Sequence, residues 1–245
     1  MKKVLIIGAT SAIAVEVARQ FAKEGASLAL LARNQKRLDE IAQDLSVRGA
    51  TVAYTGTFEA LDIASHDRVL EEAYHRFGEF DAALIAHGDL PNQDACRRSA
   101  VATQDALRSN FLSPVSFLTW LANYFETKKS GNISVISSVA GDRGRQSNYV
   151  YGAAKGGLSI FLQGLRNRLT PAGVTVTTIK PGFVDTPMTR HLPKGALFAS
   201  AELVGKRIHT AMKRGDAVVY TPFFWRYIML IIQHIPEFIF RKLKL

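Results

Sequence analysis

Tyr151 and Lys155 stand four positions apart in the stretch SNYVYGAAKGGL, residues 147–158. Side chains at this spacing share one face of an α-helix, so a phenol and an ammonium would lie one turn apart. A free tyrosine has a pKa of ~10, and a nearby ammonium favours the phenolate. We therefore expect Lys155 to lower the pKa of Tyr151 and to make it a proton donor near neutral pH. The alternative is a purely structural helix, whose glycines and alanines allow close packing against a sheet.

Three more polar residues precede this pair. Ser137 and Ser138 follow an apolar run at 131–136, and Asn110 lies further back in RSNFLSPVSFLTW. If the run is a strand, both serines lie at the carboxyl edge of a sheet, where α/β folds bind ligands. A serine, a tyrosine with its lysine, and an asparagine could then converge beside a nicotinamide ring. Asn110 has a structural alternative, which is to tie its helix to a neighbouring loop.

Alternating apolar runs and amphipathic segments must position these residues. Continuous apolar runs are typical of buried parallel strands, and apolar residues at helical spacing are typical of helices. Strands are expected within 3–10, 27–33, 51–63, 80–88, 131–141 and 173–182, and helices at about 12–25, 34–49, 66–78, 99–127 and 149–169. The alternation predicts an α/β fold: a single-domain, Rossmann-like, doubly wound parallel β-sheet with helices on both faces. A chain of 245 residues, 47% of them hydrophobic, is enough for one large core.

The turn GATSAIA, residues 8–14, joins the first expected strand to the first expected helix. In a dinucleotide-binding fold this turn faces the pyrophosphate at the positive end of a helix. Gly8 lets the backbone approach the phosphates, and Thr10 and Ser11 offer hydroxyl groups. Ala12 and Ala14 stand where glycines are commoner. An ordinary βα turn is the alternative, but the position at the start of a complete βαβ unit favours the dinucleotide.

The end of the second expected strand indicates which dinucleotide is bound. An acidic residue there would hold the adenosine ribose 2′-hydroxyl, whereas an arginine accommodates a 2′-phosphate. The sequence reads LLARNQKRL, with Arg33 in place and Lys36 and Arg37 close behind. Arg33 therefore favours NADP(H) over NAD(H). The alternative is that these cations form the solvated first turn of a helix.

The motifs GATSAIA, Asp62-Ile63, Asn110, Ser138, YGAAK and KPGFVDTPM, in this order and spacing, resemble those of the short-chain dehydrogenase/reductase family. The resemblance covers roughly residues 3–190. It implies an oxidoreductase in which the cofactor supplies a hydride and the protein supplies position and a proton. It also implies a homodimer or homotetramer, and no metal site.

The resemblance further assigns roles to individual residues. Tyr151 would be the general acid, Lys155 would bond the nicotinamide ribose, and Ser138 would polarise the substrate carbonyl. Asn110 would help order a water chain from Lys155 to solvent, and Ser137 would be the structural serine of its pair. Asp62 would bond the adenine. The residues expected to bind the cofactor are Gly8, Thr10, Ser11, Ile13, Arg33, Asp62, Ile63, Tyr151, Lys155, Pro181, Gly182, Val184 and Thr186.

The chain departs from the family pattern after the fourth expected strand. The family's Asn-Asn-Ala-Gly motif reads IAHG here, at residues 85–88. The missing asparagines remove side-chain ties around the adenine pocket, which leaves the details of this loop open. We interpret His87 as a loop residue rather than an acid–base group.

Charge and composition narrow the partners. The net charge is +10, but no basic tract of five or more residues occurs, so we expect no nucleic-acid partner. An anionic cofactor or an anionic membrane surface explains the excess equally well. The single cysteine excludes an internal disulfide and fits a reducing compartment. The start of the chain, MKKVLIIGATSAIA, lacks the apolar core of a signal peptide.

Two segments distinguish this chain from a generic family member. Residues 1–222 are expected to form the reductase domain, with a substrate lid at about 187–205, and residues 223–245 an amphipathic tail. The tail is too often interrupted to span a bilayer, and Pro236 should divide it into two short helices. Its aromatic residues and flanking cations suit a membrane interface. A subunit interface or a flap over the substrate cleft is the alternative.

Arg143 and Arg145 would either contact an anionic group of the substrate or lie on solvated surface.

These observations predict a cytoplasmic, NADPH-dependent carbonyl reductase that contacts the inner face of the membrane through residues 223–245. The tail resembles those of reductases acting on polyprenyl-phosphate-linked keto sugars or 3-keto sphingoid bases, so we expect a lipid-like substrate. One alternative is a soluble reductase of small ketones or 3-oxoacyl substrates, with the tail packed between subunits. Another is a cofactor-binding regulator without turnover, for which the intact Ser138, Tyr151 and Lys155 would have no use.

Overall fold

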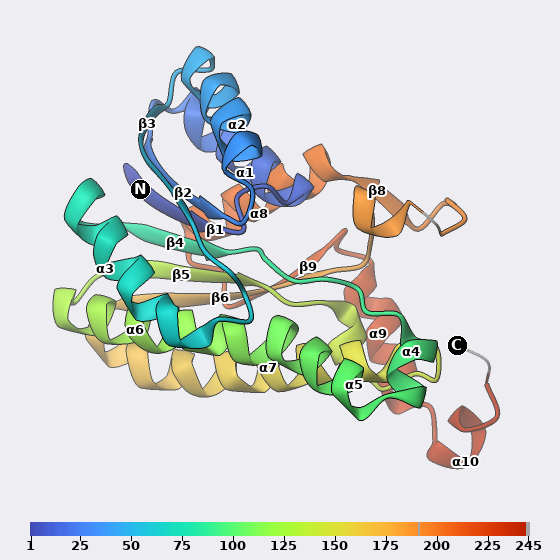
Figure 1. The fold of residues 1–245 in the computed structure, drawn as a ribbon. Coiled ribbons are helices and arrows are strands. Elements are labelled where there is room, and N and C mark those ends of the chain that lie inside the picture. Colours follow the sequence, from blue (N-terminus) through green and yellow to red (C-terminus); the bar gives the residue numbers. More distant parts are fainter. Residues whose placement is uncertain (191, 244–245) are drawn as a thin grey trace.

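The central element is a parallel β-sheet with helices on both faces (Figure 1). The structure is a computed structural model and describes residues 1–190 and 192–243. Within these residues the main sheet has seven strands in the order β3-β2-β1-β4-β5-β6-β9. The strands are β1 (Lys3–Ile7), β2 (Ser27–Ala32), β3 (Thr51–Thr57), β4 (Ala82–Ile85), β5 (Gly131–Ile136), β6 (Val174–Pro181) and β9 (Val218–Thr221). This order makes the fold Rossmann-like, as predicted.

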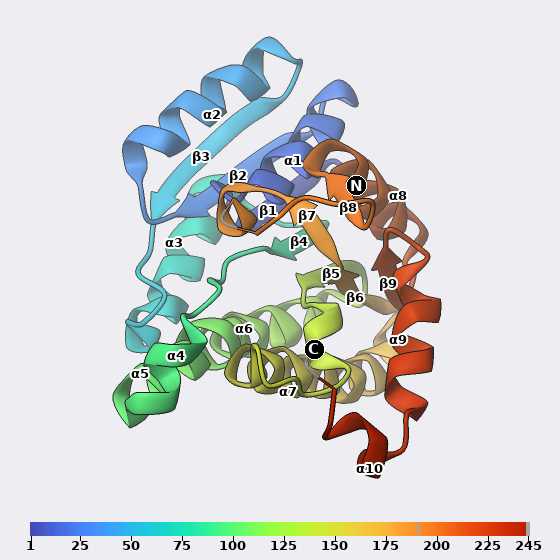
Figure 2. The same cartoon turned by 90° about the vertical axis from the view of Figure 1, so that its right-hand side faces the viewer.

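The helices cover the two faces of the sheet in separate groups (Figures 1 and 2). One face carries α1 (Ala12–Lys23), α2 (Gln35–Val47) and α8 (Ala201–Arg214). The other carries α3 (His66–Phe77), α6 (Ser113–Lys128) and α7 (Tyr149–Leu169), and two short helices, α4 (Gln93–Arg98) and α5 (Ala100–Leu107), lie near one end of it. Each face has its own hydrophobic core. The predicted single doubly wound domain is confirmed.

The central strands form where the sequence is largely apolar, because the middle of the sheet is buried on both faces. In β1, Val4, Leu5, Ile6 and Ile7 are all inaccessible to solvent. Alternate residues of such a strand point into the two different cores, so every position benefits from an apolar side chain. The edge strand β3 differs, since its sequence TVAYTGT is exposed or half-buried throughout, and β5 and β6 also bury polar residues.

Four parts of the fold differ from the prediction or were not anticipated. The helix expected at 99–127 is α5 and α6 joined by a π-helical turn, Arg108–Leu112. No element had been assigned to α8 or β9. A small second sheet pairs β7 (Phe183–Asp185) with β8 (Phe198–Ser200) and ties down the expected lid. Helix α8 begins at Ala201, so the last residues of the range 187–205 belong to this helix.

The C-terminal segment folds onto the domain. It forms α9 (Trp225–His234) and α10 (Glu237–Phe240), with Pro236 between them as predicted. Trp225 and Met229 are buried against Val139, which directly follows Ser138. Lys244 and Leu245 lie outside the described residues. Among the helices that the structure describes, none is long and apolar enough to cross a membrane.

Candidate active site

The predicted site residues gather at the carboxyl edge of the sheet. Gly8 follows β1, Arg33 follows β2, Asp62 and Ile63 follow β3, and Ser138 follows β5. Strands β1 and β4 are neighbours although their connections leave toward opposite faces, and ligands bind at such a switch point in open α/β sheets. The topology therefore brings together residues that lie far apart in the sequence.

The first βα turn is shaped by Gly8. Its φ is +84°, a conformation that favours glycine, and a Cβ there would lie 2.8 Å from the Cα of His87. The Gly8 amide donates a hydrogen bond to the Leu31 carbonyl at 2.7 Å. Thr10 and Ser11 then lead into α1, and Ile13 packs, partly buried, on the adjoining core. A compact turn at a helix N-terminus fits the pyrophosphate of a dinucleotide.

Arg33 and its neighbouring cations differ in their surroundings. Arg37 donates to the Glu40 carboxylate at 2.7 Å, and its amide donates to the Asn34 side chain that caps α2. Arg37 is thus surface structure of the first turn of α2. Arg33 directly follows β2 and has an exposed side chain.

Asp62 and Ile63 lie in the connection after β3. Asp62 precedes a short 3-10 turn, Ile63–Ser65, and its carbonyl accepts a hydrogen bond from the Ser65 hydroxyl at 2.8 Å. This turn leads into α3. The position agrees with the expected location of the adenine pocket, while the Asp62 carboxylate itself is solvent-exposed.

Glycines on α7 let the Ser138 turn lie directly on the helix that carries Tyr151 and Lys155. The short 3-10 turn Val139–Gly141 follows Ser138. A Cβ on Gly141 would be 2.6 Å from the Gly156 nitrogen, and one on Gly152 would be 2.9 Å from the Ala140 oxygen. The small residues of the opening motif therefore do serve close packing, and what they pack against is the serine turn rather than the sheet.

Polar contacts place Ser138, Tyr151 and Lys155 in one group. Lys155 Nζ lies 5.8 Å from the centre of the Tyr151 ring and donates to the Ile136 carbonyl at 3.1 Å. The Ser138 hydroxyl accepts a hydrogen bond from the Ala140 amide at 3.1 Å. It also lies close enough to the Tyr151 phenol to lower the pKa of that residue. These contacts group a buried lysine with a half-buried serine and tyrosine at the end of β5.

The pKa of Tyr151 is shifted in the direction opposite to the prediction. Burial raises it to about 12, and the Ser138 hydroxyl opposes this rise without cancelling it. Burial also lowers the pKa of Lys155 to about 8. The free energy needed to remove a phenolate from water exceeds the stabilisation that an ammonium several ångströms away can give it. The polypeptide alone thus keeps the phenol protonated at neutral pH.

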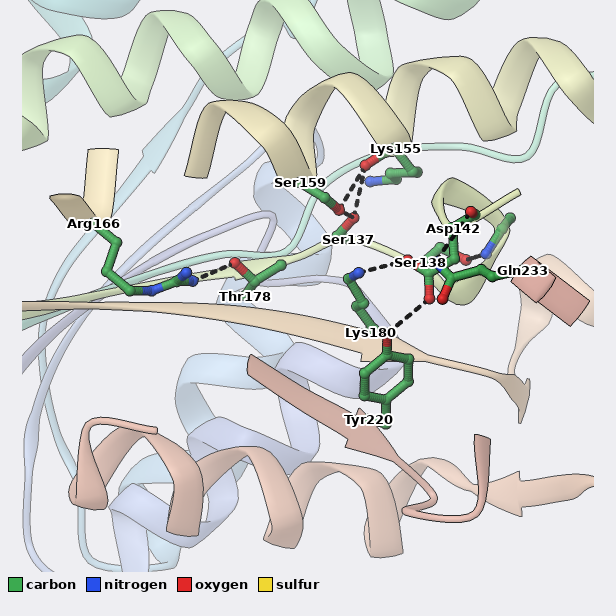
Figure 3. Close-up of polar contacts among 11 residues, drawn as sticks. Ser137, Ser138, Asp142, Lys155, Ser159, Arg166, Thr178, Lys180, Tyr220 and Gln233 are labelled. Carbon is green, nitrogen blue, oxygen red and sulfur yellow. Dashed lines mark hydrogen bonds and ion pairs between the residues drawn. The ribbon is translucent and has the colours of Figure 1, made fainter. Parts of the chain in front are cut away.

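Ser137 and Ser138 have different surroundings, as the family resemblance implied. Ser137 is buried, its hydroxyl donates to the Lys155 carbonyl at 3.0 Å, and it lies 2.8 Å from the Ser159 hydroxyl (Figure 3). These contacts tie β5 to α7. Ser138 is the serine whose hydroxyl lies beside Tyr151.

Asn110 lies in the π-helical turn and is fully buried. Its amide nitrogen donates to the Asp89 carboxylate at 2.6 Å, and its amide oxygen accepts from the Asp89 backbone at 3.1 Å. A Cβ on Gly88 would lie 2.8 Å from the Asn110 oxygen and 3.3 Å from Lys155 Nζ. Asn110 therefore ties its helix to the loop after β4, and it does so beside Lys155.

Asp89 and Gly88 are residues that the sequence reasoning missed. The negative charge of Asp89 raises the pKa values of both Tyr151 and Lys155. A glycine followed by an acid after a buried strand, in IAHGD, was the available signal. His87 in the same loop lies 2.9 Å from the Ser113 hydroxyl through Nε2, and burial lowers its pKa to about 3. It stays neutral, in agreement with its interpretation as a loop residue.

The segment after β6 holds the last predicted cofactor residues. Pro181 ends β6, and Gly182 lies so close to the indole of Trp225 that any Cβ would overlap it. Val184 is buried in β7, and Thr186 begins a short turn that Thr189 closes through a reciprocal capping box. This segment lies next to the Ser138 turn, because β5 and β6 are neighbours in the sheet.

Arg143 and Arg145, in the loop between Ser138 and Tyr151, have different environments. Arg143 is engaged by the C-terminal segment through hydrogen bonds to the Ile232, Gln233 and Ile235 carbonyls. Arg145 is partly buried, and its Nε finds no hydrogen-bond partner among residues 1–190 and 192–243. Neither arginine is simply solvated surface.

Comparisons with known proteins agree with this geometry. A family model described as short chain dehydrogenase matches residues 2–196. An uncharacterized oxidoreductase of Mycobacterium tuberculosis (strain CDC 1551 / Oshkosh) is 34% identical over 240 residues, which is 98% of this chain and 96% of the relative.

Solved structures share the fold. Levodione reductase has a TM-score of 0.81 at 21% sequence identity, covering 89% of this chain and 95% of that one. A variant of actinorhodin polyketide ketoreductase with NADPH has a TM-score of 0.80 at 19% identity, covering 91% and 97%. Together with the family match, the parallel sheet and the Ser138, Tyr151 and Lys155 group establish that this chain is an oxidoreductase belonging to the short chain dehydrogenase family.

Proposed function

We propose that the protein is an NADPH-dependent reductase that converts a carbonyl to an alcohol, with Tyr151 as the proton donor. The observation that carries this proposal is the contact of the Ser138 turn with α7. It sets a hydroxyl that can hold a carbonyl oxygen next to a phenol that can protonate it. Both groups lie at the sheet edge where a family member binds its nicotinamide dinucleotide.

The residues of the chain account for the proton. NADPH, when bound, supplies the hydride. The Ser138 hydroxyl orients the substrate carbonyl, and the Tyr151 phenol, whose pKa is raised to about 12, arrives protonated at neutral pH. Once the proton has moved to the alcohol oxygen, the Lys155 ammonium and the Ser138 hydroxyl stabilise the tyrosinate that remains. We expect water to reprotonate the phenol by way of Lys155, which lies beside Asn110.

Arg33 supports NADPH over NADH. It stands directly after β2, at the carboxyl end of the strand, and its exposed guanidinium suits bidentate binding of a 2′-phosphate. Gly8, Thr10, Ser11 and Ile13 would face the pyrophosphate, and Asp62 with Ile63 the adenine. Pro181, Gly182, Val184 and Thr186 would line the nicotinamide side. The ketoreductase with the same fold was solved with NADPH.

The exposed face of the C-terminal segment supports a lipid-like substrate and contact with a membrane surface. Within the described residues this face consists of Phe223, Tyr227, Leu230, Ile231, Phe238, Ile239 and Leu243, which we call the tail face. Arg226, Arg241 and Lys242 lie among them, and cations beside exposed aromatic residues suit an anionic interface. Substrates of the kind suggested by the tail would be keto groups on lipid-linked sugars or sphingoid bases.

A second candidate is a soluble reductase of small ketones or 3-oxoacyl substrates, which packs the tail face between subunits of a homodimer or homotetramer. A contiguous exposed apolar face supports this as well, because family members form oligomers. The names of the two structural neighbours, a levodione reductase and a polyketide ketoreductase, belong to enzymes of non-lipid ketones. The two candidates share the chemistry and differ in substrate and partner.

The test is a screen for NADPH oxidation with lipid-linked and non-lipid ketones in mild detergent. With the best ketone, Tyr151→Phe should lower turnover by about 10²- to 10⁴-fold, because the general acid is lost. NADPH binding, followed by fluorescence, should persist. Tyr149→Phe is the matched control, since Tyr149 lies two residues away and is 44% exposed. Turnover retained in Tyr151→Phe would overturn the proposed mechanism.

A further inference from the structure

Arg143 connects the active-site loop to the C-terminal segment. Its guanidinium donates to the carbonyl oxygens of Ile232, Gln233 and Ile235 at 2.8, 2.9 and 2.6 Å, at the C-terminal end of α9. It also pairs with the Glu237 carboxylate at 2.9 Å and stacks 3.8 Å from the centre of the Phe240 ring. One side chain thereby contacts α9, the linker after it and α10.

Arginine suits this contact better than lysine. The carbonyl oxygens at the end of a helix carry partial negative charge. Nη1 of Arg143 lies within hydrogen-bond distance of all three carbonyl oxygens, which share its two hydrogens, while Nη2 pairs with the Glu237 carboxylate. A guanidinium also has a face that stacks on aromatic rings, whereas an ammonium has a single nitrogen and no such face. The Arg143 side chain is 14% exposed, while that of Glu237 is 78% exposed.

Asp142, the preceding residue, is held by side chains of other elements. Its carboxylate is 2% exposed, accepts from Lys180 Nζ at 2.5 Å and from the Tyr220 hydroxyl at 2.9 Å (Figure 3). Its backbone carbonyl accepts from the Gln233 side chain at 3.3 Å. Strands β6 and β9 and helix α9 therefore all hold the loop at one residue.

Two anchored points follow Ser138 closely along the chain. The nearer one is Ala140 with Gly141, which rest on the backbone of α7. The next is Asp142 with Arg143, which are bound to the sheet and to the C-terminal segment. The turn between Ser138 and Asp142 is only Val139–Gly141, so a displacement at Arg143 has little chain in which to be absorbed.

We propose that Arg143 is a positioning residue for Ser138, and that it makes the C-terminal segment, residues 225–243, a working part of the active site. Loss of either side of this contact should move the Ser138 hydroxyl relative to Tyr151. The inference rests on the proposed carbonyl reduction for its kinetic assay, but it does not depend on membrane binding or on the substrate class.

Kinetics of Arg143→Met provide the first test, with Arg168→Met as the matched control. Arg168 also forms several side-chain hydrogen bonds, to Asn123 and Glu126, but at the far end of α7. We expect kcat of Arg143→Met to fall by about 10- to 100-fold, the cost of an ångström-scale misplacement. The Kd for NADPH should stay within about 2-fold, because the dinucleotide contacts are elsewhere. An unchanged kcat in Arg143→Met would overturn the proposal.

Truncation after Leu230 tests whether Arg143 acts through the C-terminal segment, because it removes every group of that segment that Arg143 contacts and keeps the buried Trp225 and Met229. The truncated chain should lose a similar factor in kcat, and adding Arg143→Met to it should cost little more, because the partners of Arg143 are already gone. If the kcat losses of the truncation and of Arg143→Met multiplied in the double variant, Arg143 would act by another route and the proposal would be overturned. Arg143→Lys should restore only part of the activity, since a lysine cannot reproduce the planar set of donors.

Hydrogen–deuterium exchange gives a readout that needs no turnover. Residues 138–145 should exchange faster in Arg143→Met than in the unmodified protein and in Arg168→Met. Equal exchange in all three would contradict the positioning role. If the unmodified protein oxidised NADPH with none of the ketones, the proposed function would fail, while this measurement would still decide whether Arg143 holds the loop.

Discussion

Under the proposed function, we predict that the choice of cofactor depends on Arg33. Replacing it with aspartate removes a phosphate partner and introduces a like charge. A charged hydrogen bond is worth about 1.5–3 kcal/mol, so Arg33→Asp should raise the Kd for NADPH by about 10- to 100-fold. The Kd for NADH should change much less. Titration of both dinucleotides by fluorescence would measure the ratio.

The matched control for this prediction is Arg37→Asp, four residues further on. Arg37 pairs with Glu40 on the surface of α2, so its replacement should leave the ratio of the two Kd values nearly unchanged. If Arg33→Asp left the ratio unchanged as well, the preference for NADPH would not come from this residue.

The site residues also show how far single residues are predictable. The pairing of Tyr151 with Lys155 followed from helical spacing alone, and the structure places them in one group with Ser138. The sign of the Tyr151 pKa shift did not follow, because burial decides it and burial depends on every element around the site. Asp89 was missed for the same reason, since its charge matters only because the loop after β4 meets the π-helical turn.

Helix α7 is the element on which the catalytic geometry depends, and its glycines allow a matched comparison. Gly152 and Gly164 lie on the same helix, and alanine is about 1 kcal/mol more favourable than glycine inside a helix. A Cβ at Gly164 would meet nothing within 4 Å, whereas one at Gly152 would lie 2.9 Å from the Ala140 oxygen. The serine turn lies against Gly152, which is buried, and not against Gly164, which is exposed.

We expect Gly164→Ala to raise the melting temperature and leave turnover unchanged. Gly152→Ala should gain little or no stability, because the clash offsets the helical gain, and should lower kcat by about 10-fold as the Ser138 turn moves. Thermal melts and kinetics on both variants would measure this. Equal behaviour of the two variants would show that the contact of the turn with α7 does not set the position of Ser138.

At the scale of the whole molecule, the open question is whether the tail face binds a membrane or another subunit. Leu230 and Ile231 are 53% and 68% exposed, while Trp225 and Met229 on the same helix are buried. Replacing exposed residues should therefore spare the fold. Burying one such side chain contributes about 1.5–3 kcal/mol, so Leu230→Glu with Ile231→Glu should abolish co-sedimentation with anionic vesicles. Salt should also weaken binding of the unmodified protein.

Ile160→Glu is the control, because Ile160 is 69% exposed on α7 and lies outside the tail face. It should leave vesicle binding intact. If the unmodified protein did not bind vesicles, and the double variant instead changed its mass in solution, the tail face would be a subunit interface and the membrane proposal would be wrong.

The sequence by itself determined six strands of the main sheet, most of the helices that connect them and the identity of the chemical groups, but not β7, β8, α8 or β9. Strands buried on both faces favour apolar residues, and residues four apart on a helix must share a face, so local pattern was sufficient for β1, β2 and β4 and for Tyr151 with Lys155. Only the tertiary structure decided that Arg143 serves the C-terminal segment, that Trp225 lies against Gly182, and that the Tyr151 phenol is held protonated. These depend on contacts between segments far apart in the chain and on exclusion of water, neither of which has a local signature in the sequence.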